Sequence, residues 1–241
     1  MAAVASLTGK RIVALIPAAG SGQRMGGALP KPYLRLGTRE ILAQTLAVFE
    51  AYSVIDAVWV IAAPEYCAFC QRAIIEPYGF QKVKGVVAGG ATRQASVWQG
   101  LQRVAAQADV VVVHDGVRPL LPERLLQDTL CAAVVHGAAI AAVPLKDTLK
   151  RVTETGLVEA TIPRHRLWRV QTPQAFHSRL LHEAFLYAQR HGIEGTDEAS
   201  LVEALGRRVQ VVPGDENNVK ITTPDDLRFA ETFFQAHGAR R

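Results

Sequence analysis

The chain has 241 residues, 49% of them hydrophobic, so it can bury a substantial core, and this composition excludes an intrinsically disordered protein. Lys and Arg exceed Asp and Glu by 27 to 22, a mild excess that favours small anionic ligands and lacks the clustered basicity of a nucleic-acid binder. The cysteines number only three, which argues against a disulfide framework and favours a reducing cytoplasm.

The N-terminus has only part of the pattern of a signal peptide. Lys10 and Arg11 precede an apolar run, but that run has five residues before Pro17, and a signal peptide needs about seven or more. No apolar run reaches the length of a membrane span. We therefore expect a cytoplasmic protein with no membrane partner.

Short apolar runs alternate with segments of helical periodicity along most of the chain. This alternation is typical of a parallel sheet covered by helices on both faces. We predict a doubly wound α/β fold in one domain, residues 1–241, without repeats or linkers. The predicted strands are residues 11–17, 57–63, 83–88, 110–115, 138–144 and 209–213, and the predicted helices are residues 41–52, 65–78, 92–106, 123–136, 178–191 and 196–205. A last helix is predicted after TTPDD, where Thr223 can cap, Pro224 suits the first position and Asp226 can complete a capping box.

The loop after the first strand reads PAAGSGQRMGGALPKPY, residues 17–33. In a doubly wound fold it lies at the carboxyl edge of the sheet, where ligands bind. Arg24 and Lys31 can supply full positive charges to a polyphosphate. Glycines can turn successive backbone N–H groups toward one anion, and the loop has four of them, Gly20, Gly22, Gly26 and Gly27.

Two common nucleotide motifs do not fit this loop. A P-loop requires Ser or Thr after its lysine, whereas Pro30 and Pro32 flank Lys31. A dinucleotide site requires a glycine motif that runs straight into a helix, and here the helix starts late. An ordinary glycine-rich turn with two solvated cations remains the alternative for the loop taken alone.

Cys67 and Cys70 form a CxxC pair inside the predicted helix at residues 65–78. A zinc site would need further ligands at suitable spacing, and a redox pair usually follows a strand directly. We interpret the two cysteines as small apolar side chains that pack in the core.

Three later segments place polar residues at the same edge of the sheet. In AGGATRQASVWQG, glycines precede a helix that Thr92 can cap, and Ser96 can reach the edge of a base. In VVVVHDGVRP, Asp115 is a Mg²⁺ candidate and Arg118 an anion-binding candidate, with a structural Asp–Arg pair as the alternative. His114 is interpreted as a packed or capping residue. Lys220 precedes the last helix and, taken alone, is interpreted as a surface lysine.

Residues 145–170 interrupt the alternation. The segment LKDTLKRVTETGLVEATIPRHRLWRV is polar, rich in Thr and Arg, and carries a turn signal at TETG. It predicts an extended hairpin arm that projects from the sheet. An arm with little core of its own needs another surface to pack on, so we expect a homodimer contact there.

Seven motifs occur in a fixed order: PAAGSGQRM with PKPY, AGGATRQAS, HDGVRP, PLKDTLKR, TPQAF, GTDEAS and NVKITTPDDL. Together they resemble the 2-C-methyl-D-erythritol 4-phosphate cytidylyltransferases of the non-mevalonate isoprenoid pathway, from residue 12 to about residue 234. The resemblance implies a mostly parallel, Rossmann-like nucleotidyltransferase sheet. It also implies transfer of CMP from CTP to methylerythritol phosphate, which gives 4-diphosphocytidyl-2-C-methyl-D-erythritol and pyrophosphate. Because the chain ends where that domain ends, we expect no fused second enzyme.

The resemblance also implies roles for single residues. Arg24 and Lys31 correspond to the pair at the CTP phosphates, and Lys220 to the lysine at the α-phosphate. Asp115 corresponds to the residue that helps to hold Mg²⁺. The other implied CTP-binding residues are Ala18, Ala19, Gly20, Gly22, Gly90 and Ser96, and the implied acceptor-binding residues are Arg118, Thr148, Arg164 and Thr172.

In the family the counterparts of Thr148 and Arg164 act from the second subunit of a homodimer, and Arg166 is a rival for Arg164. Pro32 and Ala91 depart from the family pattern, and Ala91 leaves the base contacts beside it open. Three alternatives for the chain are a cytidylyltransferase for another polyol phosphate such as ribitol 5-phosphate, a nucleotide-binding regulator without turnover, and an NAD-dependent dehydrogenase.

Overall fold

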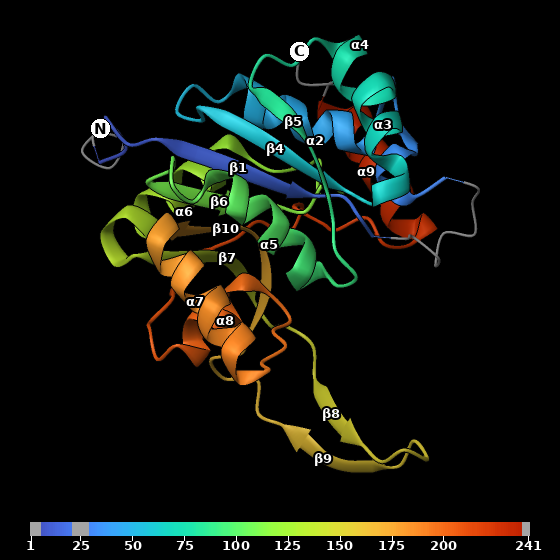
Figure 1. Cartoon of the computed structure of the whole chain (residues 1–241). Coiled ribbons are helices and arrows are strands. Elements are labelled where there is room, and N and C mark those ends of the chain that lie inside the picture. Colours follow the sequence, from blue (N-terminus) through green and yellow to red (C-terminus); the bar gives the residue numbers. More distant parts are fainter. Residues whose placement is uncertain (1–5, 21–28, 238–241) are drawn as a thin grey trace.

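The computed structural model describes residues 6–20 and 29–237. Within these residues, seven strands form one sheet in the order β11-β7-β10-β6-β1-β4-β5 (Figure 1). Only β10 runs antiparallel to its neighbours in this described sheet, so the predicted mostly parallel α/β fold is confirmed. The strands are β1 (Ile12–Pro17), β4 (Ala57–Ala62), β5 (Val83–Ala88), β6 (Val110–Val113), β7 (Ala138–Pro144), β10 (Trp168–His177) and β11 (Gln210–Pro213).

Helices cover both faces of the sheet, which explains why its central strands are apolar at nearly every position. Along β1, Ile12, Ala14 and Ile16 point to one core cluster, and Val13 and Leu15 point to the other. The first cluster is covered by α2 (Ile41–Ala51), α3 (Cys67–Cys70) and α6 (Glu123–His136). The second is covered by α5 (Arg93–Val104), α7 (Ser178–His191) and α8 (Glu198–Ala204).

The helix predicted at residues 65–78 is interrupted. It consists of η3 (Pro64–Tyr66), α3, the π-helical η4 (Gln71–Ile75) and α4 (Glu76–Tyr78). Pro77 has no N–H and its ring would collide with an α-helical carbonyl, so the helix widens just before it and Glu76 N–H bonds the Gln71 carbonyl. Cys70 belongs to the first core cluster and Cys67 is half-buried, both as free thiols.

Other helix ends follow their predicted caps. Helices α6 and α7 have the predicted bounds. The Thr92 hydroxyl accepts the Ala95 N–H at the start of α5, at 3.0 Å. At the start of α9 (Pro224–His237), Asp226 accepts the Thr223 N–H at 2.8 Å and the Asp226 N–H bonds the Thr223 hydroxyl at 3.3 Å. The predicted capping box is confirmed.

The predicted arm is present as a hairpin of β8 (Leu149–Val152) and β9 (Val158–Ile162), which projects from the sheet (Figure 1). Sequence reasoning missed β10, which begins at Trp168, inside the predicted arm, and inserts between β6 and β7. It also missed the short ladder of β2 (Arg35–Leu36) and β3 (Arg39–Glu40). No helix among the described residues combines the length and apolarity that a membrane crossing requires.

Candidate active site

A cavity of about 580 Å³ opens at the carboxyl edge of the sheet. Four segments line it: the loop after β1, the loop between β5 and α5, the end of β6, and the segment before α9. These segments carry most of the predicted nucleotide site: Ala18, Ala19, Gly20, Lys31, Gly90, Ser96, Asp115 and Lys220. Pro32 and Ala91, where the chain departs from the family pattern, also line the cavity.

The phosphate loop contributes Lys31, which begins the short helix η2 (Lys31–Tyr33) and is 9% exposed. The main chain of this loop begins at the end of β1, where the Ala18 N–H bonds the Ile61 carbonyl at 2.7 Å. Gly22, Arg24, Gly26 and Gly27 lie outside the described residues.

The loop between β5 and α5 is tightly closed around Ser96. The Ser96 hydroxyl accepts the Gly90 N–H at 3.1 Å, and its own hydrogen points to the Thr92 carbonyl at 2.8 Å or the Gly90 carbonyl at 3.2 Å. A Cβ atom on Gly90 would lie 2.6 Å from the Ala95 Cβ. Glycine is therefore required at position 90 for the close approach that this wall of the cavity makes.

Asp115 is the centre of a buried charge cluster. Its carboxylate lies 3.1 Å from Arg118 Nε, 3.1 Å from Lys220 Nζ and 3.7 Å from Arg93 Nη2. Burial by itself would raise the pKa of Asp115, but Lys220, Arg118 and Arg93 outweigh it and hold that pKa below its usual range. The cluster thus keeps one ionised carboxylate among three cations from separate segments of the chain.

Arg118 joins this cluster to the segment before α9. Its Nη1 donates to the Asn218 carbonyl at 2.7 Å, and its side chain lines a second cavity of about 230 Å³ that Lys220 also borders. Asp115 and Arg118 form the structural pair and each also borders a cavity, and their roles toward Mg²⁺ and an anion stay predictions.

Sequence reasoning missed Arg93 and Glu198. The Arg93 guanidinium bonds both carboxylate oxygens of Glu198, at 2.7 and 3.0 Å, and Glu198 is 1% exposed. Burial raises the pKa of Glu198, and Arg93 only partly opposes this. Both residues lie in motifs that the sequence displays, AGGATRQAS and GTDEAS, but no local pattern in the sequence indicated that they pair.

His114 and Thr172 lie beneath the cluster. The His114 ring is fully buried, and burial lowers its pKa to about 4. Thr172 is 4% exposed, and its hydroxyl accepts the Asp115 N–H at 3.1 Å. The predicted acceptor residue Thr172 is thus next to the charge cluster.

Thr148 and Arg164 do not line either cavity of their own subunit. Both are exposed near the root of the arm, where Arg164 donates to the Lys146 carbonyl. Arg166, the rival of Arg164, has a positive φ of 62° in the same turn. Both arginines are exposed, and neither lines a cavity of its own subunit.

The residues at the cavity fit one mode of Mg²⁺ binding. Among the described residues no group of three His, Cys, Asp or Glu side chains could hold a metal by itself. Mg²⁺ in phosphoryl-transfer sites is commonly held by one or two carboxylates, with substrate phosphates and waters as the other ligands. A single ionised carboxylate, Asp115, on the wall of a cavity of about 580 Å³ meets that requirement.

Comparison with known proteins agrees with this geometry. The sequence model of the family described as IspD, 2-C-methyl-D-erythritol 4-phosphate cytidylyltransferase, matches residues 12–236. The chain belongs to this family. An IspD-family protein of that name from Syntrophotalea carbinolica is 48% identical over 94% of this chain and 97% of its own, and one from Geotalea uraniireducens is 47% identical over 96% and 100%.

Solved IspD-family structures have the same fold. The enzyme from Thermus thermophilus superposes with a TM-score of 0.75 at 37% identity, over 93% of this chain and 99% of its own. The 4-diphosphocytidyl-2C-methyl-D-erythritol synthase from Anaerococcus prevotii gives 0.83 at 33% identity, over 96% and 99%. The chain is therefore a nucleotidyltransferase, and CTP-dependent cytidylyl transfer to methylerythritol phosphate is favoured over the ribitol phosphate, regulator and dehydrogenase alternatives.

Proposed function

We propose that CMP passes from CTP to the phosphate of 2-C-methyl-D-erythritol 4-phosphate in the 580 Å³ cavity, beside Asp115. The observation that carries this proposal is the convergence of Arg93, Arg118 and Lys220 on one buried carboxylate at the cavity wall. Glu198 pairs with Arg93, so the cluster has three cations against two carboxylates, and the remaining positive charge favours a bound polyphosphate.

The reaction brings two anionic phosphates together, so charge opposes it. We assign Lys31 and Arg24 to the CTP phosphates and Lys220 to the α-phosphate, where they stabilise the charge of the transition state. The acceptor phosphate has a second pKa near 6, so it is already largely ionised at neutral pH and needs no general base. Catalysis then consists of positioning and charge neutralisation.

Lys220 has two partners in this proposal. It lies 3.1 Å from Asp115, and its long, flexible side chain can move from that carboxylate to a bound α-phosphate. Asp115 keeps its contacts with Arg118 and Arg93 and, without Lys220, could hold Mg²⁺ together with phosphate oxygens. The ion would supply further neutralisation of phosphate charge. The low pKa of Asp115 keeps the carboxylate ionised for this role.

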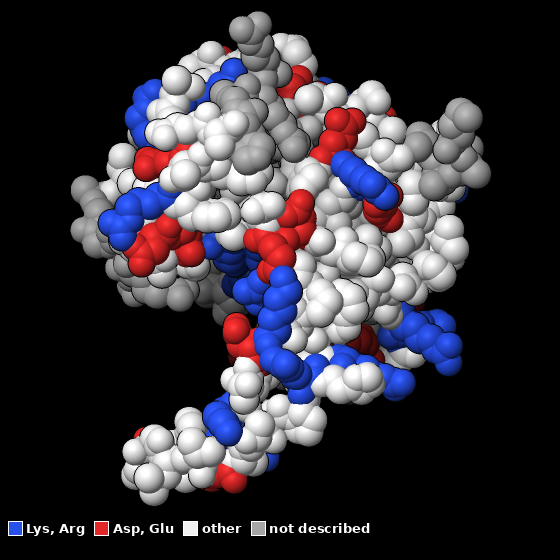
Figure 2. All heavy atoms as spheres, turned by 180° about the vertical axis from the view of Figure 1, so that it is seen from behind, with Lys and Arg blue, Asp and Glu red and all other residues white. Residues whose placement is uncertain are grey.

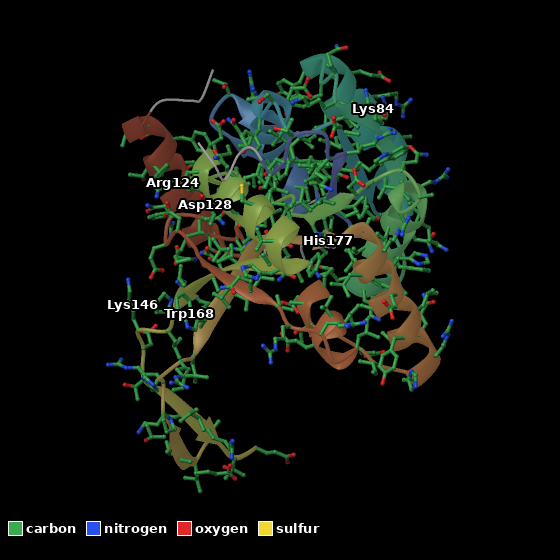
Figure 3. The ribbon with its side chains drawn as sticks, turned by 90° about the vertical axis from the view of Figure 1, so that its left-hand side faces the viewer. Lys84, Arg124, Asp128, Lys146, Trp168 and His177 are labelled. Carbon is green, nitrogen blue, oxygen red and sulfur yellow. The ribbon has the colours of Figure 1, made fainter. Side chains whose placement is uncertain are left out.

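We assign Arg118 and Thr172 to the acceptor side, together with Thr148 and Arg164 from the arm of a second subunit. The arm exposes apolar side chains that a partner would cover: Leu149, Val152, Leu157 and Val158. Lys and Arg side chains gather where the arm leaves the body (Figure 2), and Lys146 and Trp168 lie at its root (Figure 3). A homodimer would bring this basic surface to the partner's cavity.

We further assign the enzyme to the cytoplasm. Its substrates are soluble phosphates, and Cys67, Cys70 and Cys131 form no disulfide in the described structure, as expected of a reducing compartment.

The test is an assay of pyrophosphate release with CTP beside ATP, GTP and UTP, with methylerythritol phosphate or ribitol 5-phosphate as acceptor. We expect release only with CTP and methylerythritol phosphate.

At saturating CTP, Lys31→Ala and Lys220→Ala should each lower kcat about 100- to 1,000-fold, the loss typical of one transition-state contact. Lys84→Ala is the matched control, because Lys84 is exposed, lies near the start of β5 and does not line the cavity. Near-normal turnover in both site variants would overturn the assignment.

A further inference from the structure

His114 is fully buried at the end of β6 and lines neither cavity, although the next residue is Asp115. Both of its ring nitrogens have partners. Nε2 lies 3.0 Å from the Arg118 carbonyl oxygen, and Nδ1 lies 3.0 Å from the Thr172 hydroxyl oxygen. A ring held at both nitrogens has a fixed orientation.

The partners determine where the hydrogens lie. A carbonyl oxygen only accepts, so Nε2 carries the ring hydrogen and donates it to the Arg118 carbonyl. Asp115 would favour a charged imidazolium, but complete burial opposes it most strongly and the cations Arg118 and Lys220 oppose it further, so the ring is neutral and Nδ1 is an acceptor. The Thr172 hydroxyl therefore donates to Nδ1 and accepts the Asp115 N–H.

These bonds close a ring through the loop that carries the charge cluster. One side runs from the Asp115 N–H through the Thr172 hydroxyl to His114 Nδ1, and the other from His114 Nε2 to the Arg118 carbonyl. The Arg118 N–H in turn bonds the Asp115 carbonyl at 3.1 Å. Thr172 of β10 thus holds the main chain at Asp115 directly and at Arg118 through the His114 ring.

The environment of the ring supports this role. Phe49 of α2 packs against the His114 ring at a centroid distance of 5.4 Å, and the Thr45 hydroxyl bonds the Gly116 carbonyl at 3.1 Å. The loop is therefore held from α2 as well as from β10. The Thr172 hydroxyl has only one hydrogen, and once it is given to His114 none is left for the acceptor phosphate.

We infer that His114 is a positioning residue, which through Thr172 and the Arg118 carbonyl fixes Asp115 and Arg118 for the reacting phosphates. Thr172 then contributes to the reaction by holding the Asp115 main chain. Toward the second substrate, its hydroxyl oxygen can only accept a hydrogen bond, for example from a hydroxyl group of that substrate. The inference rests on the proposed function, because it takes Asp115 and Arg118 as parts of the reacting site.

Matched variants test separately the bond between His114 Nε2 and the Arg118 carbonyl and the bond between His114 Nδ1 and the Thr172 hydroxyl. Gln can place an amide near the position of Nε2 and keep the donor to the Arg118 carbonyl, whereas Asn can place one near Nδ1 and keep the acceptor for Thr172. We expect His114→Gln, His114→Asn and Thr172→Val each to lower kcat about 10- to 100-fold, because misplaced reacting groups cost that much. The KM for the acceptor should change less than about threefold, and Thr172→Ser should restore kcat.

The double variant His114→Gln, Thr172→Val gives the sharpest result. Both single changes break the same bond, so the double variant should lose little more kcat than Thr172→Val alone. His177→Gln is the control, because its ring also bonds a carbonyl, that of Val134, but His177 pairs with Val110 at the start of β6, whereas His114 follows the end of that strand. We expect it to keep the wild-type kcat.

Two outcomes overturn the inference. The first is a large rise of the acceptor KM with unchanged kcat in Thr172→Val, which would make Thr172 a direct ligand. The second is full multiplication of the two losses in the double variant. A separate readout does not depend on turnover: ¹⁵N NMR of the wild-type ring should show Nε2 protonated and Nδ1 bare. Any other state of the ring overturns the inference, whereas a correct ring in an enzyme without cytidylyl transfer would instead overturn the proposed function.

Discussion

At the scale of single residues, Arg93 has the most demanding position. It lies between Glu198, which is 1% exposed, and Asp115, which is 6% exposed, and it bonds both oxygens of Glu198. A buried carboxylate without its partner is strongly unfavourable, so Arg93 makes the burial of Glu198 possible. The planar guanidinium also suits a two-bond contact that lysine cannot make.

We expect Arg93→Ala to lower the free energy of unfolding by about 2 to 3 kcal/mol, less than for a fully buried pair because the Arg93 side chain is 31% exposed. The double variant Arg93→Ala, Glu198→Ala should lose less than the sum of the single variants. Urea unfolding measures both. Arg124→Ala is the control, since Arg124 and Asp128 form an exposed pair on α6 (Figure 3). Equal losses in Arg93→Ala and Arg124→Ala would contradict this account.

The site residues that sequence reasoning identified share a local signal. Asp115 and Ser96 follow the ends of strands, and Lys31 lies in a glycine-rich loop, so parallel topology alone places them at one edge. The partnership of Arg93 with Glu198 spans 105 residues and had no such signal. Their pairing depends on how α8 packs against the start of α5, which only the folded chain determines.

At the scale of elements, the start of α9 determines where Lys220 lies. The Asp226 carboxylate accepts the Thr222 and Thr223 N–H groups, both at 2.8 Å, and the Ile221 N–H bonds the Val117 carbonyl at 2.9 Å. The cap and this bond fix the segment on both sides of Thr222. The cap of α9 thus helps to position the segment that carries Lys220, the residue proposed to bind the α-phosphate.

Asp226→Ala removes these contacts, and we expect it to lower the free energy of unfolding by about 1 to 2 kcal/mol. Asp225→Ala changes a neighbouring carboxylate on the same turn, but Asp225 is exposed and pairs only with exposed Arg228 among the described contacts. We expect it to change stability by less than about 0.5 kcal/mol. Urea unfolding distinguishes the two, and a similar loss in both would argue against the cap.

Elements were predictable where one signal dominated. Buried parallel strands are apolar throughout, so β1, β4 and β6 were evident from their sequences. Strand β10 was missed because its inner residues include Gln171, Thr172 and Gln174, whose side-chain bonds replace the apolar contacts of an ordinary core strand. The π-helical turn also had a local cause, Pro77, but its position within the helix needed the structure.

At the scale of the whole molecule, the core contains side chains that must stay neutral. Burial raises the pKa of Cys70 from 9.0 to about 12, with a smaller opposing effect of its contact with Tyr33. The unfolded chain releases this proton above pH 9, whereas the folded protein keeps it. The stability that this thiol contributes is therefore full below pH 9 and is lost as the pH rises toward 12.

We expect the free energy of unfolding to fall by about 2 kcal/mol from this group between pH 9 and 11. Cys70→Ala removes the group, so its stability should be lower at neutral pH but should decline less steeply above pH 9. Urea unfolding under reducing conditions at several alkaline pH values measures this slope. Cys67→Ala is the matched comparison, since that thiol is only half-buried and should flatten the slope less. Parallel slopes for the wild type and Cys70→Ala would contradict the prediction.

The exposed side chains of the arm bear on the oligomeric state of the protein. Leu157 is 69% exposed and Val158 is 61% exposed in one subunit, whereas the predicted acceptor residues Thr148 and Arg164 reach neither cavity of that subunit. Both observations have one explanation if the arm packs on a second copy and completes its site. In that case the site needs Lys31 from one subunit and Arg164 from the other.

Mixing two inactive variants tests this arrangement. Lys31→Ala and Arg164→Ala each impair both sites of their own homodimer. After subunit exchange, half of the dimers are mixed and each mixed dimer has one site without either change, so about a quarter of the wild-type activity should return. If Arg164 served the site of its own subunit, every site would carry one change and no activity would return. Arg166→Ala mixed in the same way decides between the two arginines, because only the one that serves the partner's site is both impaired alone and rescued by exchange.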